Sequence, residues 1–177
     1  LGNGASVSAD YNCIDLSRQA RAGYARAGVD DVIYENVSRW SWATEQDKHS
    51  LAERPLFADE DNADFHLKTQ LPNGRYVKGS GYVTNDVVTS PLLDAAAPTS
   101  DFTNEPAPNG SRANIGVYGN TTQASQTPTN EGWLAVISLN DGGFAKGTNA
   151  LNWVAGGVAT GLHGRIEFSA DGGITWS

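Results

Sequence analysis

The chain has few of the residues on which several protein classes depend. Its 177 residues include a single cysteine, Cys13, so no disulfide can form within the chain. Methionine is absent, and we therefore expect the chain to be processed or excerpted from a longer protein. No signal-peptide pattern is present, and no apolar run approaches the ~20 residues that cross a bilayer. A thiol-poor chain of this kind is typical of exported bacterial or archaeal proteins.

Positive charge is also scarce. There are 12 Lys and Arg against 20 Asp and Glu, which gives a formal net charge of −8 and a pI near 4.7. Nucleic-acid affinity depends on Lys and Arg that neutralise phosphates, so the composition argues against a nucleic-acid partner. An acidic surface confers solubility and also suits divalent cations.

Glycine and proline are plentiful, with 20 and seven residues respectively. Both residues favour turns, and the chain is therefore predicted to be all-β. Alternating polarity predicts a short strand at 8–15 and another at 31–37. The intervening 16–28 segment, rich in Arg and Ala, is predicted to be a helical or loop excursion.

The run 90–125, SPLLDAAAPTSDFTNEPAPNGSRANIGVYGNTTQAS, combines many turn motifs with almost no helical periodicity. It resembles the closing segment of secreted right-handed parallel β-helix proteins of the pectin-lyase-like class. The resemblance implies that residues 1–120 are the terminal coils and cap of such a β-helix. It also implies structural roles for Asp94, Arg112 and Asn114, with Arg112 and Asn114 bonded to backbone carbonyls.

The segment 39–68 resembles a recurrent phrase of the same proteins. The matching residues include Trp42, Asp47, His49, Ser50, Pro55, Leu56, Phe57, Asp59, Asp64, Phe65 and Leu67. The sequence departs from the phrase at Glu53 and Arg54, where Ala-Asp is common. Each such phrase is one coil, and a coil is stabilised mainly by its neighbours.

After a predicted polar linker, 121–131, residues 132–177 resemble the first half of immunoglobulin-like sandwich domains of surface proteins. The departures are Leu139, Asp141 and Phe144. A complete sandwich takes seven strands and ~100 residues, so we expect a partial sandwich with an open edge. Such an edge invites self-association with another copy, which would build a filament.

The motif SADGGITW at the end of the chain fits the Asp-box pattern. Asp171 would hydrogen-bond turn amides, Gly173 would supply a positive φ, and Trp176 would cover a small core. All three residues are therefore predicted to be structural.

Three acidic side chains, Asp59, Asp61 and Asp64, lie close together in the sequence. Alternate carboxylates on a loop can converge on Ca²⁺, although the spacing is not that of an EF-hand. The alternative is a solvated turn. Trp40 and Trp42 are the candidates for glycan binding, because residues two apart on a strand share a face. Packing in the core is the alternative for this pair.

Catalysis has weaker candidates, His49 and Arg54, which supply suitable side chains without diagnostic spacing. The sequence thus favours a non-catalytic structural or adhesive segment of an extracellular or cell-surface β-helix protein that contacts polysaccharide or cell-envelope glycan. The alternative is part of a polysaccharide lyase, hydrolase or epimerase that acts on acidic glycans.

Overall fold

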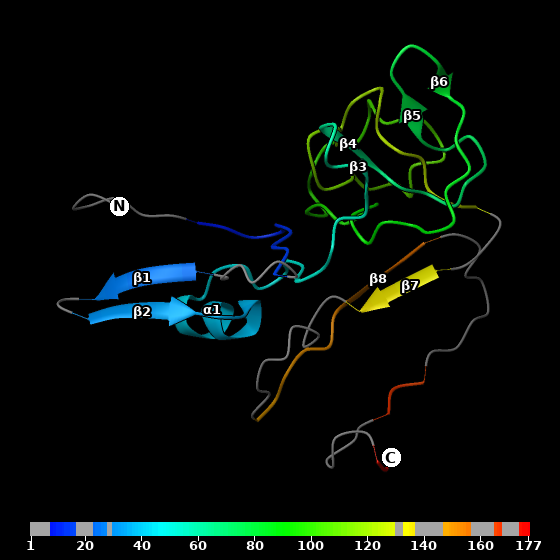
Figure 1. Cartoon of the computed structure of the whole chain (residues 1–177). Coiled ribbons are helices and arrows are strands. Elements are labelled where there is room, and N and C mark those ends of the chain that lie inside the picture. The colour runs from blue at the N-terminus through cyan, green and yellow to red at the C-terminus, as the bar shows by residue number, and fades with distance from the viewer. Residues whose placement is uncertain are drawn as a thin grey trace.

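The computed structural model of the chain describes residues 8–16, 23–27, 30–129, 133–136, 147–156, 165–167 and 174–177. Within these ranges the regular structure is mostly strand, with one short helix (Figure 1). The strands form four sheets, each of two strands. The predicted β-rich class is therefore confirmed.

Each strand pairs with the next strand along the chain, and all four pairs are antiparallel. The pairs are β1 (Gly23–Ala27) with β2 (Asp30–Tyr34), β3 (Phe57–Asp59) with β4 (Asp64–Leu67), β5 (Tyr76–Val77) with β6 (Gly81–Tyr82), and β7 (Trp133–Val136) with β8 (Trp153–Gly156). No sheet in the described ranges is parallel or larger than two strands, and no strand there is longer than five residues.

The first segments differ in part from the sequence predictions. The segment predicted as a strand at 8–15 contributes one isolated parallel bridge, between Cys13 and Leu51. The strand predicted at 31–37 is present as β2, which ends earlier, at Tyr34. The predicted helical or loop excursion at 16–28 instead contains β1 in its described part.

The helix α1 (Val37–Thr44) occupies a segment that was predicted to be extended. Asn36 caps its first turn by accepting a hydrogen bond of 2.8 Å from the Arg39 N–H, and Glu45 ends it with a φ of 57°. Asparagine is a preferred N-cap residue, which accounts for the helix start. Among the described residues no helix has the length and apolar character needed to cross a bilayer.

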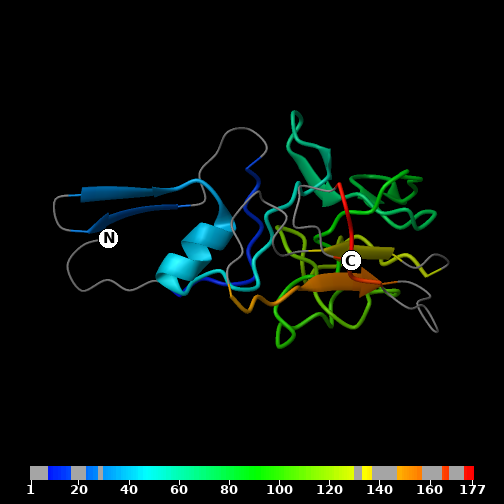
Figure 2. The ribbon, with the colours of Figure 1, turned by 90° about the horizontal axis from the view of Figure 1, so that it is seen from below.

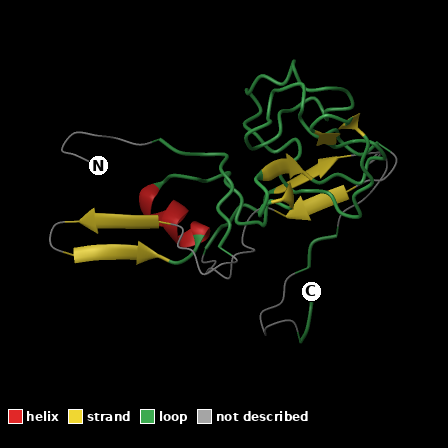
Figure 3. Ribbon diagram, turned by 45° about the horizontal axis from the view of Figure 1, so that its top comes forward, coloured by secondary structure: helices red, strands yellow, loops and turns green. Residues whose placement is uncertain are grey.

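Residues 51–129, here called the loop body, enclose the hydrophobic core. The core consists of buried aliphatic side chains, namely Leu51, Leu67, Leu92, Leu93 and Ala95. Cys13, Phe57 and Ile115 pack against it. Figures 2 and 3 show β1, β2 and α1 to one side of the loop body, which contains β3 to β6.

The described part of the predicted linker, 121–129, is fastened into the loop body. The Ser125 hydroxyl donates to the Leu67 carbonyl at 2.6 Å, and the Gln126 N–H donates to the Gly74 carbonyl at 2.8 Å. The Thr69 hydroxyl donates to the Gln126 carbonyl at 2.8 Å. These long-range bonds make the segment a structural part of the loop body, which its polar composition does not reveal.

Gly110 tests how tightly the loops pack. A Cβ atom at this position would lie 2.0 Å from a carboxyl oxygen of Asp94, and the φ of Gly110 is +56°. We expect Gly110→Ala to destabilise the fold by about 3 kcal/mol, from the positive φ and the overlap together. Urea unfolding measures this change.

The matched control is Gly79→Ala, because Gly79 also has a positive φ but has no atom within 4 Å of the added Cβ. This control substitution should lower the free energy of unfolding by only the conformational strain, about 1–2 kcal/mol. Equal losses of unfolding free energy in the two variants would show that the loop around Gly110 moves to accommodate the added Cβ.

Candidate functional site

The carboxylate of Asp47 joins three segments of the chain. It is buried and accepts hydrogen bonds from the Trp40 indole at 2.8 Å, the Asn12 side-chain amide at 2.8 Å and the Ser50 hydroxyl at 2.7 Å. Its own backbone has a φ of 53°, a conformation that Asp tolerates better than most residues. Asp47 therefore fixes the turn that precedes Leu51 against the N-terminal segment.

The neighbouring residue His49 forms a second contact with the N-terminal segment. Asp10 accepts from the His49 backbone N–H at 2.7 Å, and its other oxygen lies 2.7 Å from His49 Nδ1. Burial alone would raise the pKa of Asp10, but the hydrogen bonds from His49 and Tyr11 outweigh it and lower the pKa. The His49 ring stacks on Tyr11 with a centroid distance of 5.0 Å.

The surface cluster of Asp10, Tyr11 and His49 also includes a side chain of the loop body. The Arg112 guanidinium lies 5.8 Å from the centroid of the Tyr11 ring. Arg54, the other catalytic candidate, is exposed. An imidazole held by a carboxylate can act as a general base, which is the role that the sequence suggested for His49.

The acidic loop between β3 and β4 does not collect its carboxylates around one point. Asp59 accepts from the Asn62 side chain at 2.7 Å, and its hydrogen bonds with Asn62 lower the pKa of Asp59. Asp64 lies 2.5 Å from His66 Nδ1, and Asp61 is exposed. No group of three His, Cys, Asp or Glu side chains able to hold a metal is found in the described part of the chain. The geometry gives the calcium prediction no support.

His66 is a buried titratable residue that the sequence did not single out. Its side chain stacks on Tyr118 with a centroid distance of 3.7 Å and an interplanar angle of 9°. Its Nδ1 atom faces Asp64, whereas its Nε2 atom is buried without a hydrogen-bond partner. Among the residues that the structure describes, this ring is not part of any group of three His, Cys, Asp or Glu side chains able to hold a metal ion.

The polar core of the loop body contains Asp94 and Glu105. Burial, and then the nearby charge of Glu105, raise the pKa of Asp94 to about 6, against the opposing effects of Thr127 and Arg112. Burial also raises the pKa of Glu105. Asn114 bridges the two residues, because its side chain accepts from the Asp94 N–H and its own N–H donates to Glu105, both at 2.8 Å.

Arg112 and Asn114 lie where they bind backbone carbonyls. Arg112 donates to Ala96 at 2.5 Å and to Ala95 at 3.3 Å, and the Asn114 amide donates to Ser125 at 2.8 Å. These are the contacts that the resemblance predicts for both side chains.

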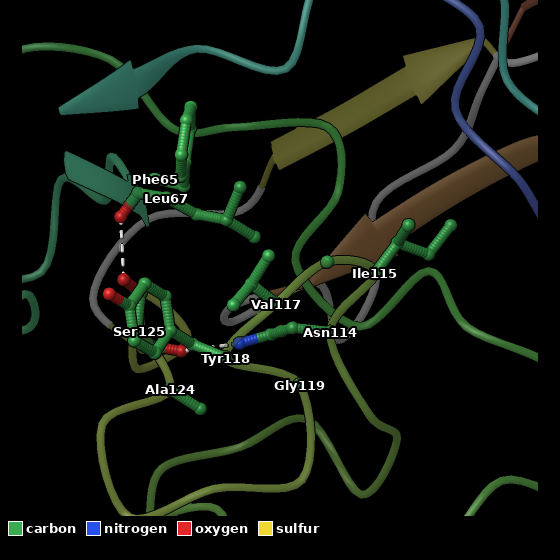
Figure 4. Close-up of a pocket in the computed structure, with 10 residues that line it drawn as sticks. Phe65, Leu67, Asn114, Ile115, Val117, Tyr118, Gly119, Ala124 and Ser125 are labelled. Carbon is green, nitrogen blue, oxygen red and sulfur yellow. Dashed lines mark hydrogen bonds between the residues drawn. The ribbon is translucent and has the colours of Figure 1, made fainter. Parts of the chain in front are cut away.

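A cavity of about 10 Å³ lies beside Tyr118, between the strand β4 and the loop 114–119 (Figure 4). Phe65 and Leu67 form one wall, and Asn114 and Ser125 contribute polar atoms. This volume is about that of one water molecule, so the cavity cannot hold a sugar ring.

The two tryptophan candidates do not form a shared ledge. Trp40 packs edge-on against Tyr34 and donates to Asp47, whereas Trp42 is 86% exposed. The expectation that they share one face of a strand was wrong, because they lie on α1, where residues two apart point in different directions. Of these two side chains, Trp42 is the one exposed enough to contact a ligand.

The predicted Asp-box falls mostly outside the described residues. Asp171 and Gly173 lie there, and Trp176, which is described, is 61% exposed.

No family model, no curated protein and no solved structure matches this chain. The assignment of a function therefore depends on the chemistry of the described residues.

Asp47 provides a test of the contact between the N-terminal segment and the loop body. We expect Asp47→Ala to lower the free energy of unfolding by about 3 kcal/mol, because three donors lose a charged acceptor. Unfolding in urea, followed by tryptophan fluorescence, measures the loss. Asp61→Ala, which removes an exposed carboxylate, is the control and should change stability little. A loss below about 1 kcal/mol for Asp47→Ala would contradict a central role for this carboxylate.

Proposed function

We propose that the chain is a non-catalytic structural segment of an extracellular or cell-surface protein. In this proposal, stacked segments of the chain end a right-handed parallel β-helix, and the segment presents an adhesive surface to polysaccharide or cell-envelope glycan. A partial Ig-like sandwich follows.

The observation that carries the proposal is the parallel contact between the N-terminal segment and the start of the loop body. Cys13 bridges Leu51, the Leu51 N–H donates to the Asn12 carbonyl at 2.7 Å, and the Ile14 N–H donates to the Leu51 carbonyl at 2.8 Å. Both Cys13 and Leu51 belong to the same apolar cluster. Parallel contact between segments far apart in sequence, with a shared core, is how coils of a solenoid stack.

The use of the buried and half-buried polar groups also supports a structural role. Asp47, Asn114 and Arg112 all bind groups of the chain itself. Burial raises the pKa of the Cys13 thiol to about 11, so this cysteine is a poor nucleophile at neutral pH. These residues fasten loops and leave little for chemistry on a substrate.

The proposed glycan contact centres on Trp42. Its indole is 86% exposed on the outer side of α1, and large exposed aromatic side chains are enriched at binding surfaces. Trp40, by comparison, is held against Tyr34 and Asp47 and serves the fold.

Affinity electrophoresis in gels that contain pectin or alginate tests this contact. We expect the wild-type protein to be retarded and Trp42→Ala to bind about tenfold more weakly, which corresponds to about 1.4 kcal/mol. Val87→Ala is the matched control, because Val87 is also 86% exposed but is not aromatic. Equal retardation of the wild-type protein and Trp42→Ala would remove Trp42 from the proposed surface, and no retardation of either would refute the glycan contact.

A second candidate function rests on the Asp10–His49 pair, in which the carboxylate holds the imidazole at 2.7 Å. If the chain cleaves acidic polysaccharide by elimination, unsaturated uronate accumulates and His49→Ala lowers the rate by at least about 100-fold. Arg54→Ala tests the second predicted residue in the same assay. We expect the wild-type protein to form no such product, and product formation that depends on His49 would overturn the non-catalytic proposal.

A further inference from the structure

Two carboxyl groups are buried together in the loop body. Asp94 is 7% exposed and Glu105 is 5% exposed. One oxygen of Glu105 accepts from the backbone N–H groups of Asn114 and Asn120, both at 2.8 Å. Its other oxygen, Oε2, is buried and has no hydrogen-bond partner.

Arg112 is the cationic side chain near Asp94. Its guanidinium favours the ionised form of Asp94, but it donates its hydrogen bonds to the carbonyls of Ala95 and Ala96. Within the described residues neither Asp94 nor Glu105 forms an ion pair. Two negative charges at this place would therefore repel each other without a cation paired to either, and a proton on one of them removes the repulsion.

The contact between Asp94 and Thr127 ties the carboxyl group to the segment 124–127. Thr127 Oγ1 is 3.0 Å from one carboxyl oxygen of Asp94 and 2.9 Å from the other. A hydroxyl group has only one proton, so an ionised carboxylate must share it between both oxygens. This hydrogen bond favours the ionised form of Asp94, but burial and the charge of Glu105 outweigh it, so Asp94 holds a proton more readily here than in water.

The Asp94–Thr127 pair fastens the segment 124–127. The Thr127 N–H also donates to the Pro108 carbonyl at 2.8 Å, and Gln126 is tied to Gly74. The backbone of Gly110 lies directly against the Asp94 carboxyl, which limits the movement of the carboxyl on that side. Beyond this segment the chain continues to β7.

We propose that Asp94 and Thr127 form a proton-dependent latch, which holds the segment 124–127 in mildly acidic surroundings and loosens it as the surroundings become alkaline. The latch sets how firmly the part of the chain beyond residue 129 is anchored to the loop body. It requires neither the glycan contact nor the β-helix arrangement, so it stands apart from the proposed function.

The direction of the effect follows from linkage. The folded pKa of about 6 lies above the ordinary value of 3.8, so the stabilisation is complete at pH values below 3.8 and is lost as the pH rises through 6. If Asp94 becomes exposed when the segment opens, the opening constant should be about tenfold larger at pH 7.5 than at pH 5.

Backbone hydrogen exchange of Gln126 and Thr127, corrected for the intrinsic pH dependence of exchange, measures this opening. We expect the protection of both amides to fall about tenfold between pH 5 and pH 7.5 in the wild-type protein. Equal protection at the two pH values, or greater protection at the higher one, would overturn the proposal. An infrared band of a protonated carboxyl at pH 5 that disappears in Asp94→Asn would locate the proton independently.

Asp94→Asn is the informative variant, because Asn accepts the φ of 54° and can both donate to and accept from the Thr127 hydroxyl. It should keep the segment protected at both pH values. Thr127→Val should lower the exchange protection of the segment at both pH values, whereas Thr127→Ser should behave as the wild type. Asp61→Asn is the control at an exposed carboxyl, and it should leave the pH dependence unchanged. If Asp94→Asn retains the wild-type pH dependence, a different group is responsible and the latch is refuted.

Discussion

The loop body depends on hydrogen bonds from buried side chains to the backbone, and Asn114 lies at the centre of these bonds. Its side chain accepts from the Asp94 N–H and donates to the Ser125 carbonyl, while its own N–H is bound by Glu105. Strands of two to four residues satisfy few backbone groups within the loop body. Buried backbone groups must be paired, so polar side chains take the place that a larger sheet would fill.

The buried side chain of Asp47 likewise holds the chain together by hydrogen bonds, at the junction with the N-terminal segment. It binds Trp40, Asn12 and Ser50, and the parallel bridge to Cys13 follows directly after this turn. A single carboxylate thereby orients the helix α1, the N-terminal segment and the first residue of the core. The dependence on a few polar residues gives the fold a sensitivity to pH and to single substitutions that a sheet with a large apolar core lacks.

Parts of the candidate site could be predicted from sequence, and the limits have physical causes. Arg112 and Asn114 stand in a dense run of turn motifs, where side chains commonly bind the backbone. Trp40 and Trp42 were misplaced because the N-cap Asn36 starts a helix, which separates residues that a strand would put side by side. Asp10 gave no local signal, since its partner His49 is 39 positions away.

Composition alone predicted the β-rich class, because abundant glycine and proline favour turns, and in the described residues no strand is longer than five residues. The single cysteine and the acidic charge likewise needed no structure to exclude an internal disulfide and to argue against a phosphate-backbone partner. Only the tertiary structure decided which polar groups meet. The segment 121–129 has the composition of a linker, yet Thr127 lies against Asp94, 33 positions away. Burial and neighbouring charge, which raise the pKa of Asp94, arise only when distant loops pack together.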